Sequence, residues 1–195
     1  MINSHPQAME FHAFTTRYNG RTHRIITEVG VSSAFDPANP PAIPPVHYRT
    51  KALWDTGATG SVITQSTAVA LGLTPVGNAL VNHAGGTSPS ATYLVNVMLP
   101  NNVSVAGVLV TECHDVAGDF GAIIGMDIIM SGDLSLSCVD GKSMMSFRIP
   151  SLGENDYVKE ANRIQFAGVG RNDPCPCGEK HKDGKPMKFK HCHGK

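Results

Sequence analysis

The stretch Leu53-Trp54-Asp55-Thr56-Gly57-Ala58 places a carboxylate at the end of an apolar strand and directly before a turn. Residues 46–54 alternate between two faces, as a strand with one buried side does, and they run straight into Asp55. Gly57 permits a sharp turn in which backbone amides approach the carboxylate, and Thr56 can brace the loop. The stretch predicts an acid/base group on a rigid loop, although Asp, Thr and Gly are also ordinary turn residues.

Most of the chain between residues 24 and 149 has the pattern of short strands. Asp140-Gly141 predicts a tight hairpin turn, and Gly85-Gly86 marks a second hairpin. The expected fold class is mainly β and barrel-like, with one or two short helices. The expected strands cover 24–31, 46–54, 93–99, 103–111, 121–125, 134–139 and 142–149.

Two segments interrupt these strands. The Pro-rich segment 36–45 can form neither a helix nor a central strand, so we expect an exposed loop. Thr64 or Ser66 can cap a short helix that runs to Leu71, and Gly72 follows at the position where helices commonly end in a left-handed residue.

The composition describes a globular chain. Of 195 residues, 41% are hydrophobic and 16% charged, and the formal net charge is zero, which gives no general argument for nucleic acid or an anionic membrane. Residues 1–20 contain no continuous apolar core, so no secretory signal is expected, and no later segment is long enough to span a bilayer. The five cysteines suit metal binding in a reducing compartment, so a cytoplasmic protein is expected.

Residues 24–149 resemble the retropepsin-like aspartic proteases, in particular bacterial and phage-type members. Three elements carry the resemblance in the family's order: Asp55-Thr56-Gly57-Ala58, the Gly-rich hairpin, and Ile123-Ile124-Gly125. The resemblance implies a closed β-barrel, a catalytic turn formed by Asp55, Thr56 and Gly57, and an apolar element packed behind that turn. It also implies a flap over the substrate, formed by His83, Ala84, Gly85, Gly86 and Thr87.

The chain has one Asp-Thr-Gly and no Asp-Ser-Gly, whereas proteolysis of this type needs two carboxylates that share one proton. We therefore expect a homodimer in which each subunit supplies one Asp55. The ionised carboxylate takes a proton from a water that attacks the peptide carbonyl, so neither a covalent intermediate nor a catalytic cofactor is implied.

The C-terminal tail has the spacing of a metal site. Cys175 and Cys177 flank a proline, and Cys192 with His193 can complete a closed Cys3His site of the structural zinc type, although His181 and His191 are competing ligands. The tail resembles the SEC-C zinc module found at the C-terminus of the bacterial translocation ATPase. That resemblance implies a structural Zn²⁺ and docking to a protein or the ribosome, while the surrounding lysines are equally well explained as a solvated face.

These patterns predict four regions: an unassigned N-terminal arm (1–22), a retropepsin-like domain (23–150), a linker (151–169) and a zinc module (170–195). The expected function is an aspartic endopeptidase with a peptide or protein substrate and no membrane partner. The alternative is a noncatalytic dimeric adaptor whose zinc module recruits a client. The intact Asp-Thr-Gly-Ala favours the enzyme, since an adaptor has no physical need for that carboxylate. A zinc-dependent hydrolase is disfavoured because four protein ligands leave no position for a substrate.

Overall fold

The computed structural model describes residues 12–194 except 37, 44, 84–85, 101–102 and 115–118. The chain divides into two compact units, Met1–Leu152 and Gly153–Lys195. The boundaries expected from the sequence, at 22/23, 150/151 and 169/170, stay predictions. None of the helices in the described part of the chain is long and apolar enough to cross a membrane.

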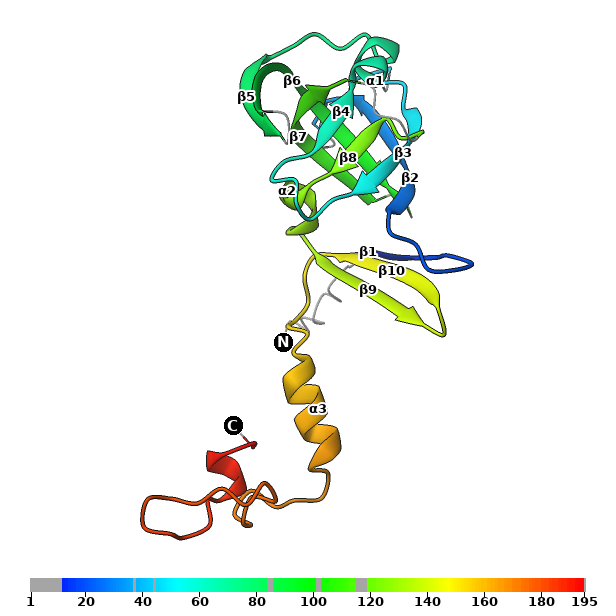
Figure 1. Ribbon diagram of the computed structural model, residues 1–195. Helices are drawn as coiled ribbons and strands as arrows, with labels where there is room; N and C mark the ends of the chain where they lie inside the picture. The colour runs from blue at the N-terminus through cyan, green and yellow to red at the C-terminus, as the bar shows by residue number, and fades with distance from the viewer. Residues whose placement is uncertain are drawn as a thin grey trace, which may run out of the picture. The chain divides into compact units, whose positions relative to one another are not determined.

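Six strands of the first unit close into a barrel (Figure 1). Neighbouring strands follow the order β2-β3-β8-β4-β7-β6, and pairing of β2 with β6 closes the ring, so the expected mainly β, closed-barrel fold class is confirmed. A further strand, β5, pairs with β6 and extends the sheet beyond the ring. The bounds are β2 (Ile25–Ser33), β3 (Tyr48–Trp54), β4 (Val62–Thr64), β5 (Gly77–His83), β6 (Gly86–Leu99), β7 (Val103–Cys113) and β8 (Ala122–Ile124).

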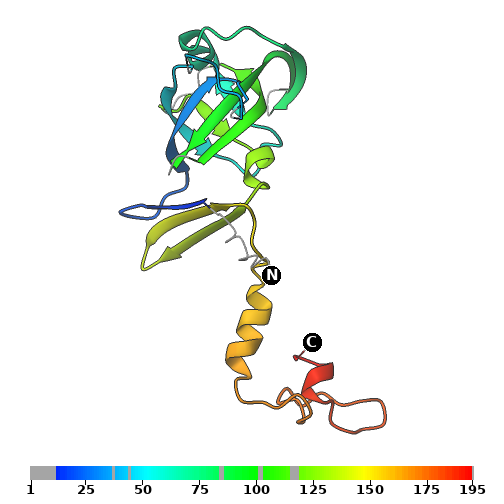
Figure 2. The same cartoon turned by 180° about the vertical axis from the view of Figure 1, so that it is seen from behind.

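Alternation along the strands fills the barrel. On β6, Tyr93, Val95, Val97 and Leu99 are all buried, and their neighbour Leu94 is exposed. Because successive side chains of a strand point to opposite faces, this pattern assigns one face of β6 to the core. The view from behind shows the long strands β6 and β7, which form one side of the barrel wall (Figure 2).

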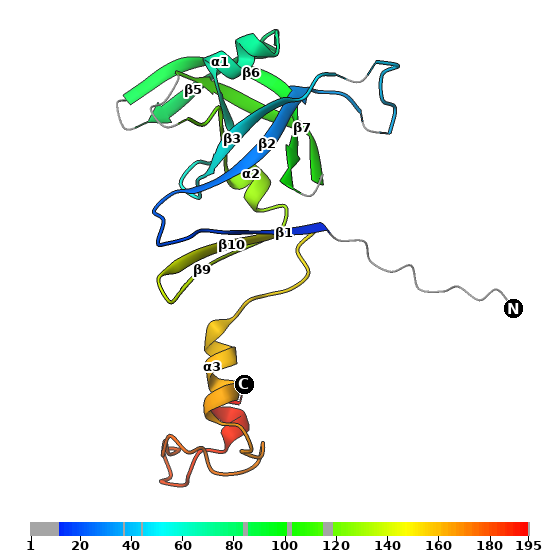
Figure 3. The ribbon, with the colours of Figure 1, turned by 90° about the vertical axis from the view of Figure 1, so that its right-hand side faces the viewer.

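A second sheet of three strands packs on the barrel (Figure 3). Its order is β1 (His12–Arg17), β10 (Lys142–Ile149) and β9 (Asp133–Val139), all antiparallel. Phe14 of β1 and Phe147 of β10 contact Trp54 of the barrel, with ring centroids 5.9 and 5.0 Å from the Trp54 ring. This aromatic cluster anchors the small sheet to the residue that precedes Asp55.

The turns and the short helix follow their local sequence signals. Asp140 and Gly141 have φ angles of 50° and 72°, the pair of positive values that a two-residue hairpin turn between β9 and β10 requires. Thr64, not Ser66, caps helix α1 (Gln65–Ala70), because its side chain accepts a hydrogen bond from the Thr67 amide. Helix α2 (Met126–Ile129) follows β8 directly.

Two elements lie where the sequence predicted an arm and a linker. Strand β1 lies within 1–22, and helix α3 (Tyr157–Gln165) lies within 151–169. Neither has a clear apolar period, because β1 has one buried residue, Phe14, and α3 has none. The second unit also contains the 3-10 helix η2 (Phe189–His191).

Candidate active site and metal site

The loop that carries Asp55 joins two strands that lie on either side of β8. β3 runs parallel to β8, with Leu53 opposite Ile123, whereas β4 runs antiparallel to it, with Val62 opposite Ile123. The amide of Asp55 donates to the Ile124 carbonyl at 3.0 Å, which fixes the first residue of the loop to β8. Asp55 is therefore held at the end of a paired strand, as the sequence predicts.

The carboxylate of Asp55 is oriented by its own turn. The Gly57 amide donates to Asp55 Oδ1 at 2.8 Å, and the Ala58 amide donates to the Asp55 carbonyl at 3.2 Å. Asp55 is half-buried, while Thr56 and Gly57 are exposed. In the described part of this single chain, the Thr56 hydroxyl makes no hydrogen bond, so the bracing expected of Thr56 is not formed within one subunit.

The apolar element behind the turn makes close backbone contact with it. A Cβ at Gly125 would lie 2.5 Å from the carbonyl carbon and oxygen of Gly60, so only glycine fits there without movement of the backbone. The Met126 amide donates to the Ala58 carbonyl at 2.8 Å. The element Ile123-Ile124-Gly125 thus supports the loop from behind.

Asp127 has a structural role. Its carboxylate accepts hydrogen bonds from the Ser61 hydroxyl at 2.7 Å, the Ser61 amide at 3.0 Å and the Ile128 amide at 2.9 Å. These contacts join the end of the Asp55 loop to the first turn of α2. The sequence alone did not identify Ser61 as the partner of Asp127, because the two residues are far apart in the chain.

The Gly-rich hairpin is formed by β5 and β6, with His83 paired with Gly86. Gly86 and Thr87 are exposed, and Gly86 has a φ of 121°, which favours glycine. Ala84 and Gly85, also expected in the flap, lie outside the described residues. Contact between this hairpin and a substrate stays a prediction.

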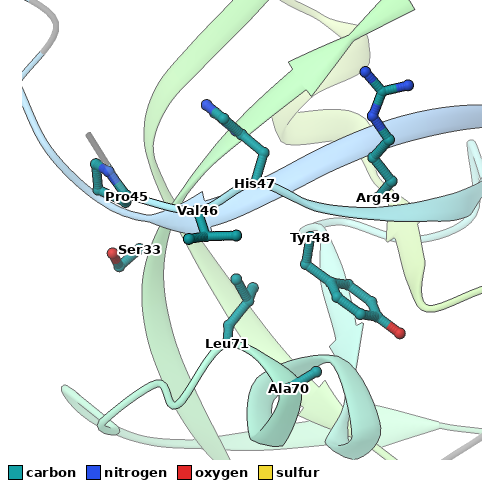
Figure 4. A pocket seen from close by; sticks show the side chains of 8 residues that line it. All are labelled: Ser33, Pro45, Val46, His47, Tyr48, Arg49, Ala70 and Leu71. Atoms are coloured by element: carbon teal, nitrogen blue, oxygen red, sulfur yellow. The ribbon is translucent and has the colours of Figure 1, made fainter. Parts of the chain in front are cut away.

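A surface pocket of about 700 Å³ lies elsewhere on the first unit (Figure 4). His47 and Arg49 project to one side of the backbone around β3, and Val46 and Tyr48 project to the other, as alternation requires. None of the lining residues belongs to the Asp55 loop or the hairpin. They are Ser33, Pro45, Val46, His47, Tyr48, Arg49, Ala70 and Leu71. This pocket therefore does not include Asp55.

The four cysteine and histidine residues named from the tail come together in the second unit. Ligand atoms of Cys175, Cys177, Cys192 and His193 all lie within 4.8 Å of one another. The separations are 3.4 Å between the sulfurs of Cys175 and Cys177, 3.5 Å between those of Cys177 and Cys192, and 3.1 Å from Cys192 to His193 Nδ1. The competing histidines, His181 and His191, are not in the cluster formed by the described residues.

This geometry fits a tetrahedral metal ion. Zinc–sulfur bonds of about 2.3 Å in a tetrahedron place sulfurs about 3.8 Å apart, slightly more than the distances found here. Burial alone would raise the pKa of the Cys175 thiol, but hydrogen bonds from the Cys177 amide and from His193 outweigh it and lower that pKa to about 6. Burial and hydrogen bonds to Cys177 and Glu179 raise the pKa of Cys192 to about 12. The lowered pKa of Cys175 favours its thiolate, the form that binds metals.

Comparison with known proteins gives matches in both units of the chain. A model of the aspartyl protease family matches residues 47–128, which include the Asp55 loop and Ile123-Ile124-Gly125. The chain is also similar to a solved retropepsin-like aspartic protease from Rickettsia conorii, with 13% identity and a TM-score of 0.44, over 72% of this chain and 96% of that one. For EIAV protease complexed with the inhibitor HBY-793, the sequence identity is 17% and the TM-score is 0.39, over 54% of this chain and 85% of that one.

The C-terminal segment is similar to the protein translocase subunit SecA. Identity is 63% over 48 residues for SecA of Variovorax paradoxus, which covers 25% of this chain and 4% of that protein. For SecA of Legionella pneumophila strain Corby, identity is 48% over 52 residues, which covers 26% of this chain and 5% of that protein. This chain therefore spans only a small part of the length of the SecA proteins that it matches.

The family match and the SecA match cover the regions of the two candidate sites. The aspartyl protease match contains the turn that orients the Asp55 carboxylate, and the SecA match lies at the C-terminus with the Cys3His cluster. Residues 47–128 thus match the aspartyl protease family, and the C-terminal segment is similar to SecA, which is consistent with a SEC-C motif.

Proposed function

We propose that this protein is an aspartic endopeptidase that acts as a homodimer. The observation that carries the proposal is the Asp55 turn: a half-buried carboxylate, oriented by the Gly57 amide at 2.8 Å, on a loop fixed to β8 and α2. A carboxylate that only ends a strand needs no such support from behind. General acid/base chemistry does need it, since the group must be held in one geometry.

The second carboxylate comes from Asp55 of a second copy of this chain. The sequence contains one Asp-Thr-Gly, and Asp127 is engaged by Ser61 and Ile128, so Asp127 is not available as the partner. Two adjacent carboxylates share one proton. The ionised one takes a proton from water, the water oxygen attacks the peptide carbonyl, and the protonated one donates a hydrogen bond to the carbonyl oxygen. The exposed Thr56 hydroxyl is free to bind the second subunit.

The β5–β6 hairpin acts as the flap in this proposal. Residues 83–87 close over a bound peptide and exclude water from the two carboxylates. The exposed Leu80 and its cross-strand partner Pro89 give this hairpin an apolar surface that suits contact with a peptide.

The Cys3His cluster holds a structural Zn²⁺ in this proposal. Four protein ligands close a tetrahedral ion, so the metal stabilises the fold of the second unit and takes no part in peptide hydrolysis. Thiols kept reduced for metal binding fit a cytoplasmic location. By similarity to the SecA segment, we assign the module to docking on a protein or ribosomal partner, which brings clients to the protease.

The test of catalysis compares the wild type with Asp55→Asn on a mixed peptide library, with the oligomeric state measured on the same samples. We expect the wild type to cleave as a dimer, and Asp55→Asn to dimerise but to lose activity by about 10²-fold or more. Asp140→Asn is the matched control, since Asp140 is exposed and asparagine tolerates its positive φ. Folded dimers of both proteins that do not cleave any peptide would instead support the noncatalytic adaptor.

The test of the metal measures zinc per chain in purified full-length protein. We expect one ion per chain in the wild type, loss of the ion in Cys175→Ser and His193→Ala, and retention in Cys138→Ser and His191→Ala. Cys138 lies on β9 and His191 lies outside the cluster, so these two variants control for the loss of a thiol and of an imidazole. Zinc loss in His191→Ala but not in His193→Ala would reassign the nitrogen ligand.

A further inference from the structure

Phe166, the residue that ends helix α3, lies against a metal-site histidine. Its ring centroid is 4.9 Å from that of His193 and 5.5 Å from that of Phe189 in η2. Its amide also donates to the Asn162 carbonyl at 2.9 Å and so closes the last turn of α3. One residue thus belongs to both the helix and the wall of the metal site.

Phe166 and Cys175 are the two buried side chains among the described residues of the second unit, with exposures of 9% and 4%. A unit this small cannot build an ordinary hydrophobic core, so a metal and its surroundings take that role. The core of the second unit therefore consists of the metal ligands and the ring that Phe166 contributes from α3.

The His193 ring depends on packing for its orientation. Its Nδ1 faces the sulfurs of Cys175 and Cys192 at 3.3 and 3.1 Å. A metal-binding histidine usually donates its other ring N–H to an acceptor, which fixes the ring. Within residues 153–194, no hydrogen bond of His193 Nε2 to protein is present, and the ring of His193 packs against Phe166 in a tilted contact.

Helix α3 in turn depends on Phe166. It has nine residues and none of them is buried, and Tyr157, Val158 and Ile164 are about 70% exposed. Isolated helices shorter than about 12–15 residues are marginal in water. The cap from Asp156, which accepts from the Val158 and Lys159 amides, stabilises the first turn, and Phe166 is the anchor at the other end.

The similarity to SecA extends over the same region. The match of 48 residues is longer than the Cys/His segment 170–195, so a match that reaches this segment begins upstream of α3. The segment similar to SecA and the structural unit Gly153–Lys195 thus both include the helix.

We propose that α3 is part of the metal module: Phe166 positions His193 for the metal, and metal binding in turn stabilises α3. The inference rests on the metal site proposed above and extends it to a residue outside the Cys/His segment. Linkage is reciprocal. If packing of Phe166 against His193 raises the affinity for the metal, metal binding raises the stability of the packed helix by the same free energy. The segment 151–169 is then a helical element whose order follows metal occupancy.

The experiment uses the full-length chain and two readouts that do not depend on proteolysis. Zn²⁺ affinity is measured by competition with a chromogenic chelator, and hydrogen exchange of the α3 amides is measured with and without Zn²⁺. We expect Phe166→Ala to weaken Zn²⁺ binding by about 10-fold or more. We also expect Zn²⁺ to slow exchange in α3 of the wild type but not of the variant.

Two further variants separate positioning from general loss of structure. Ile164→Ala, on the same helix but 69% exposed, is expected to bind Zn²⁺ as the wild type does, and Phe166→Trp is expected to restore most of the affinity that Phe166→Ala loses. Equal Zn²⁺ affinity of Phe166→Ala and wild type, with exchange in α3 unchanged by Zn²⁺, would overturn the coupling while leaving the metal site in place. A wild type that binds no Zn²⁺ would overturn both.

Discussion

The hydroxyl of Ser61 donates a hydrogen bond of 2.7 Å to Oδ1 of Asp127. The same hydroxyl accepts one of 3.0 Å from the Gly125 amide, and Ser61 is only 2% exposed. These two contacts connect the end of the Asp55 loop to the start of α2. Because water cannot replace them, their loss has a predictable cost.

Ser61→Ala removes the donor to Asp127 and leaves the buried Gly125 amide without its partner. We expect the free energy of unfolding to fall by about 1–3 kcal/mol. Urea titration followed by the fluorescence of Trp54, the single tryptophan, measures it. Thr59→Ala, at an exposed position of the same loop, is the control, and equal stability of both variants would contradict the structural role of Ser61.

Gly125→Ala tests the close approach of Gly125, which lies between β8 and α2, to the Asp55 loop. The new methyl group would lie 2.5 Å from Gly60 backbone atoms, so the loop has to move, at a cost of about 1–3 kcal/mol or more. Urea unfolding midpoints report the change. Gly60→Ala is the matched control, because a Cβ there meets nothing within 4 Å. A Gly125→Ala protein as stable as Gly60→Ala would show that the loop does not pack as described.

Thr27 provides the hydrogen-bond partner of the Trp54 indole inside the barrel, at 2.9 Å. Thr27→Val keeps the shape but leaves the buried indole N–H unpaired, and we expect a loss of about 1–3 kcal/mol in unfolding free energy. Thr27→Ser keeps the hydroxyl and is expected to lose less. A larger loss of unfolding free energy in Thr27→Ser than in Thr27→Val would mean that packing of the methyl group, not the hydrogen bond, stabilises this site.

Asp133 makes stability depend on pH at the end of the first unit. Hydrogen bonds from the Ser151 hydroxyl and then from the Leu152 amide and the Arg148 side chain lower the pKa of Asp133 from 3.8 to about 2. A lowered pKa in the folded state adds stability above the unfolded value of 3.8, and that stability is lost as the pH falls from about 4 to about 2.

We therefore expect Asp133→Asn to unfold at lower urea concentration than the wild type at pH 6, and the two midpoints to approach each other between pH 4 and about 2. Asp140→Asn controls for the loss of one negative charge in the same hairpin. A difference between wild type and Asp133→Asn that stays constant across this pH range would argue against the hydrogen bonds described.

Local patterns in the sequence predicted the elements whose signals lie within a few residues. Asp140-Gly141 predicted its turn because asparagine, aspartate and glycine most readily adopt the two successive positive φ angles that such a turn requires. Thr64 and Ser66 were the two caps predicted for α1, of which the structure uses Thr64, and the alternation before Asp55 predicted β3. The cysteine and histidine spacing predicted a cluster in the tail but left His181 and His191 as competing ligands, and the structure places His193 with the three cysteines.

Long-range pairing was decided by the tertiary structure alone. β1 pairs with β10, which places Phe14 opposite Phe147, and no local pattern marks β1, because only Phe14 is buried in it. The partnership of Ser61 with Asp127 and the insertion of β8 between β3 and β4 likewise join residues distant in the chain.

The sequence by itself thus determined the strand alternation, the Asp55 turn and the spacing of the cysteines in the tail, because side-chain periodicity and turn chemistry act over neighbouring residues. The tertiary structure decided which strands pair, what supports the Asp55 loop, and that Phe166 contacts His193. Those contacts depend on burial of surfaces that come together only when the whole chain folds, and α3, with no buried residue of its own, depends on Phe166 for its contact with the Cys3His cluster.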